Sequence, residues 1–253
     1  MPNLPDNWNG LSFLDHITRL EEECSAIGKA QVAHLGKRAP DCYEALGMSL
    51  ALLDCAAGCW WGCKGGDHRL EYLIGRAANS AYAAILLLQR GYYDQALSSA
   101  RGLGEIANLL FLFVIDNSQI DAWKTANVVT RRRDFSPVKV RLALEIKNAP
   151  IPIDKERYRL LSGYSIHVEP DAIPQSHDKG GHAKTAPMYQ EAGFLLALNE
   201  IALPVGYITS ATGIVLKLPI EGQKIFRDTG RVLEEAVGGI NVSVRGRPWF
   251  KLH

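Results

Sequence analysis

Apolar residues recur every three to four positions along most of the chain, the spacing of one face of an α-helix. The N-terminal segment shows this pattern at Leu11, Leu14, Ile17, Leu20, Cys24 and Ile27. Strand-like alternation is limited to residues 240–244, which are too few to form a sheet alone. The pattern therefore predicts an all-α protein with more than half of its residues in helices.

Capping residues, glycines and prolines divide the pattern into about eight or nine helices. We expect them over residues 11–36, 41–63, 67–88, 94–115, 121–128, 137–147, 154–168, 188–218 and 220–237. Residues 169–187 read as one long irregular loop, and residues 240–253 as a basic, aromatic tail. No repeat or low-complexity tract interrupts the chain, so residues 1–253 are predicted to form a single-domain helical bundle.

The composition is that of an ordinary globular protein, with 47% apolar and 22% charged residues in 253. A net charge of +1 gives no overall attraction to nucleic acid or acidic lipid. The N-terminus lacks the pattern of a signal peptide. The longest apolar stretch, residues 194–218, is interrupted by Asn199, Glu200 and Pro204, which favours a buried, kinked helix over a membrane span. We therefore expect a cytoplasmic protein that does not enter a membrane.

One polar group interrupts the apolar helix predicted over residues 94–115. Arg101, Glu105 and Asn108 follow an i, i+4, i+7 spacing and share one face. Residues 109–115 are all apolar, so this end of the helix should be buried on all sides. Two interpretations stay open: an Arg101–Glu105 ion pair with Asn108 bonded to nearby backbone, or a pocket in which Arg101 binds an anion and Glu105 orients it.

A second polar group lies at the end of the helix predicted over residues 154–168. Pro170 ends this helix, so His167 falls in the last turn, where the helix dipole favours the protonated ring. Tyr164 precedes it by about one turn. Histidine is suited to proton transfer near neutral pH, although a structural histidine is an equally good interpretation.

Together these two groups resemble a known family. The segments are Gly-Tyr-x-x-x-Ala-x-x-x-x-Arg-x-x-x-Glu, ending at Glu105, and Tyr-x-x-Leu-Ser-x-x-x-x-His, ending at His167. They resemble an uncharacterised family of bacterial helical proteins that is distantly similar to the HEPN superfamily. The resemblance covers residues 91–168 and implies a HEPN-like core.

Many HEPN proteins are metal-independent RNases of toxin–antitoxin and anti-phage systems. The resemblance therefore implies Arg101, Glu105 and His167 as catalytic residues, with Asn108, Arg159, Ser162 and Tyr164 in support. In nuclease members, four to six residues separate the arginine from the histidine on one helix. Here seven residues separate Arg159 from His167, a step of about 12 Å along a helix. Either Arg101 takes the arginine role, or the nuclease chemistry is absent.

Partners follow from the same resemblance: RNA, a second copy of the chain in a homodimer, and an antitoxin or defence protein. The densest basic patch, Arg131, Arg132 and Arg133, would hold the RNA phosphates, unless it is simply a solvated face. Two other classes of function remain. One is a non-catalytic interaction module, and the other is a small-molecule sensor with an anion pocket at Arg101.

Five cysteines are expected to be reduced and free of metal. Cys55, Cys59 and Cys63 have an i, i+4, i+8 spacing, which on a continuous helix places the outer two about 12 Å apart. A packing stripe of small residues is therefore favoured over a metal site. The ligand-rich segment His167, Glu169, Asp171, His177, Asp178 and His182 matches no metal motif. The sequence thus predicts neither a metal nor a cofactor.

The two polar groups should meet in the folded chain, because buried polar groups are best tolerated where they satisfy one another. We expect His167 beside Arg101 and Glu105, at the floor of a cleft edged by residues 169–187. Catalysis needs their polar atoms within about 3–7 Å. If His167 lies far from Arg101 within one chain, the two can meet only across a dimer.

Overall fold

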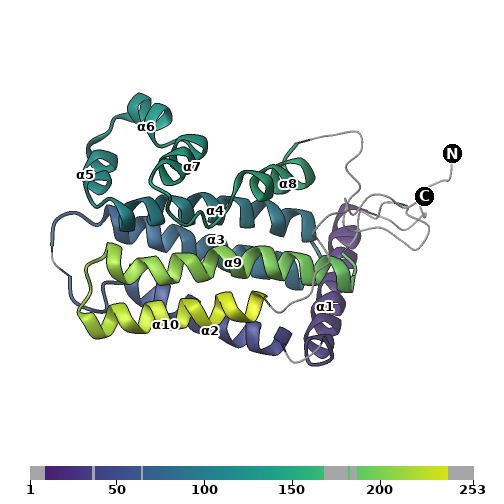
Figure 1. Cartoon of the computed structure of the whole chain (residues 1–253). Helices are drawn as coiled ribbons and strands as arrows, with labels where there is room; N and C mark the ends of the chain where they lie inside the picture. Colours follow the sequence, from purple (N-terminus) through teal and green to yellow (C-terminus); the bar gives the residue numbers. More distant parts are fainter. Residues whose placement is uncertain (1–8, 36–37, 64, 168–181, 183–186, 239–253) are drawn as a thin grey trace.

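The computed structural model describes residues 9–35, 38–63, 65–167, 182 and 187–238, and within them it contains ten α-helices and no strand (Figure 1). The helices are α1 (Gly10–Val32), α2 (Arg38–Ala57), α3 (Arg69–Gln89), α4 (Tyr93–Ile115), α5 (Ser118–Thr125), α6 (Val128–Asp134), α7 (Pro137–Ile146), α8 (Lys155–Ser165), α9 (Glu191–Val215) and α10 (Ile220–Gly238). The all-α prediction and the predicted helical majority are confirmed. The predicted count of eight or nine helices is wrong.

The additional helix is α6, which has seven residues and contains Arg131, Arg132 and Arg133. Its N-cap is Asn127, whose side chain accepts a hydrogen bond from the Thr130 N–H. Because asparagine is a preferred N-cap residue, Asn127 could have indicated a helix start in the sequence. The apolar periodicity missed α6 because none of its residues is buried.

A second difference lies at the end of α2, which stops at Ala57 instead of continuing to Cys63. Cys59 has a φ of 55°, and Gly62 has a φ of 101°. Both values belong to the left-handed region, which a right-handed helix cannot contain. Cys55, Cys59 and Cys63 therefore do not form a continuous helical stripe, and that prediction is wrong.

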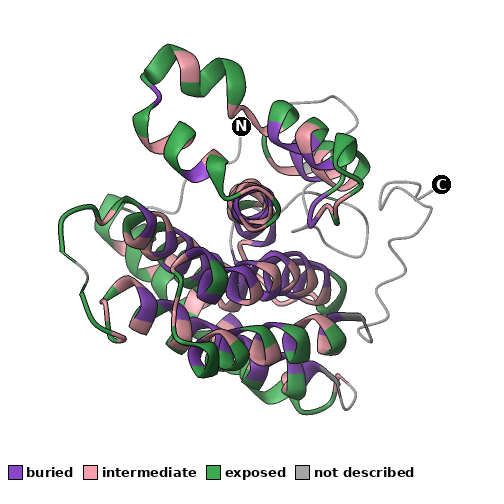
Figure 2. Cartoon of the chain, turned by 60° about the vertical axis from the view of Figure 1, so that its left-hand side comes forward, coloured by how far each residue is buried: buried purple, intermediate pink, exposed green. Residues whose placement is uncertain are grey.

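Helix α9 lies at the centre of the bundle, where it packs against α2, α3, α4 and α10 (Figure 1). It is buried along most of its length, as expected for the long apolar stretch (Figure 2). By length and composition, α4 and α9 are each apolar enough to cross a membrane. For α9, 72% of the apolar window is covered by the rest of the protein, which is typical of a core helix.

Glycine allows α9 and α10 to approach closely. A Cβ placed on Gly230 of α10 would lie 2.6 Å from the carbonyl oxygen of Gly206 on α9. Farther along α9, a Cβ on Gly213 would lie 2.9 Å from the Cα of Gln223. Real Cβ atoms do not make such contacts, so this helix pair requires glycine at both places.

Helices α5 to α8 form a smaller layer on the side of α4 that faces away from α9 (Figure 1). Leu112 of α4 packs with Val140 and Leu144 of α7, and α8 packs against α4. Within the stretch predicted to be fully enclosed, Leu110, Leu112 and Phe113 are buried, but Ile115 is 45% exposed. Helix α4 thus emerges at its C-terminal end. Residues 168–181, 183–186 and 239–253, which include most of the expected loop and tail, lie outside the described residues.

Candidate functional site

The site is centred on Arg101, which α4 presents to α8. Its Nε donates a hydrogen bond to the Ser162 Oγ at 2.8 Å, and one terminal nitrogen donates to the Tyr158 hydroxyl. The other terminal nitrogen pairs with the Glu105 carboxylate at 3.1 Å. We call Arg101, Glu105, Tyr158 and Ser162 the interhelical cluster. The structure therefore joins Arg101 and Glu105 of α4 to Tyr158 and Ser162 of α8, whereas the expected meeting of Arg101 with His167 stays a prediction.

Tyr158 completes the cluster as both a hydrogen-bonding group and a platform. Its hydroxyl donates to the Glu105 carboxylate at 3.1 Å, and the Arg101 guanidinium lies 4.3 Å from its ring centroid. Burial raises the pKa of Tyr158 above its ordinary value, and the Glu105 charge adds to this effect. The hydroxyl is therefore protonated at neutral pH and available as a donor. Tyr158 is the first residue of the motif that ends at His167, but the sequence alone indicates no role for it.

The cluster is accessible from solvent on one side. The Arg101 side chain is 22% exposed and the Glu105 side chain is 33% exposed. A guanidinium held against an aromatic ring and oriented by a carboxylate is a group that can bind an oxyanion. For full contact, an anion must compete with the hydroxyl and carboxylate partners that Arg101 has in this structure.

Asn108 lies two turns along the same helix face, but it has a different environment. It is 4% exposed, and its amide group exchanges two hydrogen bonds with the backbone of Ile153, at 2.9 and 3.0 Å. Gly104 lies beside this contact, and a Cβ on it would be 2.5 Å from the Ile153 Cγ1. Asn108 therefore fixes the chain before α8 onto α4, as the structural interpretation expected, and contributes no group to the interhelical cluster.

Two charged groups near the cluster were missed by the sequence analysis. Arg157 forms a bidentate ion pair with the buried Glu200 of α9. Its Nε and one terminal nitrogen each donate to a Glu200 carboxylate oxygen at 2.7 Å. Arg141 of α7 is also buried, and its guanidinium lies 5.8 Å from the Tyr158 ring centroid. Its Nε has no hydrogen-bond partner among the described residues. No spacing rule pairs residues 43 positions apart, so only the fold reveals these contacts.

His167 follows the last turn of α8 and its side chain is exposed. Its backbone N–H donates to the Ser162 carbonyl at 2.8 Å, so it is tied to the residue whose side chain holds Arg101. The described contacts of Arg101 do not include the His167 ring. The 169–187 loop, which would edge the expected cleft, lies mostly outside the described residues.

The remaining predicted residues have separate places. Arg159 is exposed on α8, and the backbone of Tyr164 belongs to the same helix. On α6, the Arg131 Nε donates to the Ala126 carbonyl at 3.0 Å, and Arg133 pairs with Asp134. Arg132 is exposed. Helix α6, which carries these three arginines, and helix α8 lie toward opposite ends of α4 (Figure 1).

Comparisons of the chain with protein-family models, with curated proteins and with solved structures found no match. The functional assignment therefore depends on the chemistry of the residues described above.

Proposed function

We propose that this protein is a HEPN-like RNase of bacterial toxin or anti-phage type, which acts on RNA in the cytoplasm as a homodimer. One observation carries the proposal. Ser162 holds the Arg101 guanidinium with its side chain and the His167 N–H with its carbonyl. The Arg101 guanidinium and the backbone of His167, two of the residues that the resemblance implies as catalytic, are thus both tied to Ser162 of α8.

In the proposed reaction, the RNA 2′-hydroxyl attacks the adjacent phosphate and the 5′-oxygen of the next nucleotide leaves. His167 removes the proton from the 2′-hydroxyl or donates one to the leaving oxygen. Arg101 binds the non-bridging phosphate oxygens and stabilises the added negative charge, while Glu105 and Tyr158 hold its guanidinium in place. The exposed arginines of α6 would bind phosphates farther along the RNA. An antitoxin or other defence protein would restrain this activity.

The interaction module is the second candidate, because each nitrogen of the Arg101 guanidinium already has a partner within the chain. In this case, the interhelical cluster fixes the register of α8 on α4 and contributes only to stability. His167 then has no function that depends on its titration.

Expression in bacteria and cleavage of RNA by the purified chain distinguish these two candidates. The RNase predicts growth arrest and cleavage in EDTA, both lost in His167→Ala and in Arg101→Lys, with normal thermal melting of His167→Ala. The matched controls are His34→Ala and Arg76→Lys, which change an exposed residue in the turn after α1 and an exposed residue of α3. If His167→Ala cleaves as fast as the wild type, the RNase proposal fails and the interaction module replaces it.

A further inference from the structure

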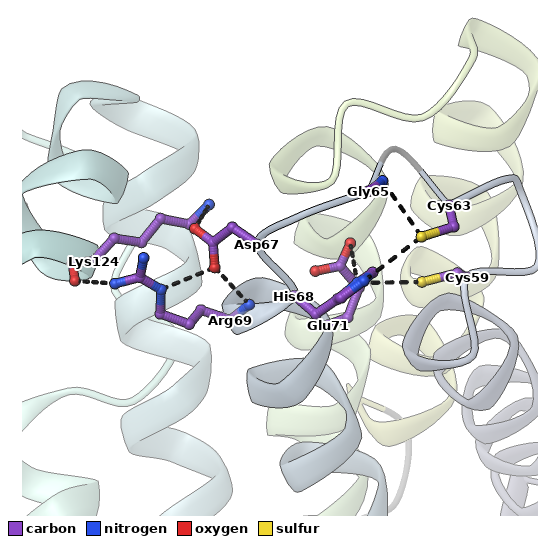
Figure 3. Close-up of polar contacts among 8 residues, drawn as sticks. All are labelled: Cys59, Cys63, Gly65, Asp67, His68, Arg69, Glu71 and Lys124. Carbon is purple, nitrogen blue, oxygen red and sulfur yellow. Dashed lines mark hydrogen bonds and ion pairs between the residues drawn. The ribbon is translucent and has the colours of Figure 1, made fainter.

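A second group of reactive side chains lies between α2 and α3, where the helical stripe was expected. Cys59, Cys63 and His68 each direct one possible ligand atom toward the others, and these three atoms all lie within 4.8 Å of one another (Figure 3). The Cys59 Sγ is 3.7 Å from the His68 Nδ1, and the Cys63 Sγ is 3.6 Å from Nε2. We call these residues the thiol–imidazole cluster.

The course of the backbone brings the three residues together. Helix α2 ends at Ala57, and the chain then turns back through left-handed positions at Cys59, Gly62, Gly65 and Gly66. A cysteine with a φ of 55° is unusual, because its Cβ disfavours this conformation. Such a residue persists where the surrounding structure or a bound group holds it. This turn, which replaces the expected helix, removes the geometric objection to a metal at these cysteines.

The cluster has the composition and spacing of a zinc site. Thiolate and imidazole are the preferred ligands of Zn²⁺, and a thiolate sulfur and an imidazole nitrogen on one tetrahedral zinc are about 3.6 Å apart. The two sulfur-to-nitrogen distances agree with this value, although they involve different nitrogens of the ring. Because one zinc ion binds a single ring nitrogen, the imidazole would rotate to present that nitrogen to both sulfurs.

Neighbouring groups supply the surroundings that such ligands need. The Glu71 carboxylate lies 4.0 Å from the His68 Nδ1; if it moved to hydrogen-bond distance, it would accept the Nδ1–H and leave Nε2 as the ligand. The Gly65 N–H donates to the Cys63 Sγ at 3.4 Å.

The next residues anchor the loop to the rest of the protein. The Asp67 carboxylate accepts hydrogen bonds from the Arg69 N–H and Nε, at 3.1 and 2.8 Å, and pairs with Lys124 of α5 at 3.0 Å (Figure 3). Arg69 also donates to the Lys124 carbonyl. His68 is thus fixed at the start of α3, whereas the cysteines approach it from the end of α2.

From these contacts, we propose that Cys59, Cys63 and His68 bind one Zn²⁺ ion, with Glu71 orienting His68 and the fourth position open to water or a further ligand. The ion joins the end of α2 to the start of α3 and stabilises the turn between them. This site is independent of the proposed RNase, since it shares no residue with the interhelical cluster.

Zinc analysis of the full chain tests the proposal. The protein is expressed without a histidine tag, purified under reducing conditions without chelator, and analysed by mass spectrometry for metals. We expect about one zinc per chain, falling to about a tenth or less in Cys59→Ser, Cys63→Ser and His68→Gln. Cys55→Ser and His34→Gln are matched controls and should retain the zinc.

A second measurement covers variants that fail to fold. Replacing zinc with Co²⁺ in the wild-type chain should produce a thiolate-to-cobalt charge-transfer band, and chelator should lower the melting temperature by about 5–10 °C. Three results would overturn the proposal: no zinc or cobalt bound by reduced protein, metal content unchanged in all three ligand variants, or a Cys59–Cys63 disulfide in freshly purified protein. RNA cleavage does not enter either measurement, so failure of the RNase proposal leaves this test intact.

Discussion

The two polar clusters of this protein differ in how the chain assembles them. The interhelical cluster is built from residues on two helices, and each helix shows its residues in the sequence at regular spacing. The thiol–imidazole cluster is built on a loop and one helix start, where left-handed residues decide which side chains meet. Periodicity therefore finds the first cluster and misses the second.

The largest effect should come from Asn108, which joins α4 to the backbone before α8. Asn108→Ala leaves the buried N–H and C=O of Ile153 without partners, so we expect a loss of about 2–4 kcal/mol in the free energy of unfolding. Urea denaturation followed by circular dichroism measures it. Asn117→Ala, at an exposed cap whose side chain makes no capping hydrogen bond, should change stability little. Equal effects of the two variants would refute this assignment.

Two glycines on α4 should respond with opposite signs. In Gly104→Ala, the new Cβ would lie 2.5 Å from the buried Ile153 side chain, which should cost about 1–3 kcal/mol. In Gly102→Ala, the Cβ meets no other atom within 4 Å, so the better helix propensity should stabilise the protein by about 0.5–1 kcal/mol. Thermal melting of both variants is the measurement. A loss of stability in both would show that helix packing does not distinguish these positions.

Tyr158→Phe tests the interhelical cluster itself. The substitution keeps the ring below Arg101 but removes the hydroxyl between Arg101 and Glu105, so we expect a loss of about 0.5–1.5 kcal/mol. Tyr72→Phe, at an exposed tyrosine of α3, is the control.

The same tyrosine predicts a dependence on alkaline pH. Because its pKa in the folded chain lies above the ordinary value of 10.0, its stabilisation is complete below that value and is lost as pH rises through the folded-state pKa. The difference in stability between the wild type and Tyr158→Phe should therefore shrink at high pH. A difference that stays constant with pH would contradict this sign.

The smallest effect concerns Asp67, beside the thiol–imidazole cluster. Hydrogen bonds from Arg69, and then from Lys124, hold the pKa of this carboxyl well below its ordinary value of 3.8. Its stabilisation is therefore present above that value and is lost as pH falls toward the lower folded-state pKa. The stability of Asp67→Asn should approach that of the wild type between about pH 6 and about pH 2 in urea unfolding. Asp15→Asn, at an exposed residue of α1, should show no comparable convergence.

Much of the helical architecture could be predicted from local patterns. The ends of α3, α4, α7 and α10 lie within about two residues of the predicted positions. The short, exposed α6 was missed, because a helix that buries no residue has no apolar periodicity to detect. The early end of α2 was missed because four apolar residues, Cys59, Trp60, Trp61 and Cys63, follow it and extend the helical pattern. Trp60 is 77% exposed, whereas Trp61 packs against Phe226.

For the candidate site, the sequence supplied Arg101, Glu105 and Ser162, and the structure joined them. It also supplied His167, whose relation to Arg101 in an oligomer stays a prediction. The Arg157–Glu200 ion pair and the buried Arg141 were inaccessible to sequence reasoning, since their contacts connect helices that no local rule relates.

The sequence by itself determined that this protein is helical and that α9 is buried, because apolar periodicity and total burial are properties of single segments. It also determined that Arg101 and Glu105 share a face, since that follows from helix geometry alone. Only the tertiary structure decided that Tyr158 and Ser162 hold Arg101, and that Cys59 and Cys63 turn toward His68. Those contacts depend on how helices pack and where a loop reverses, and both are set by the free energy of the whole chain instead of by neighbouring residues.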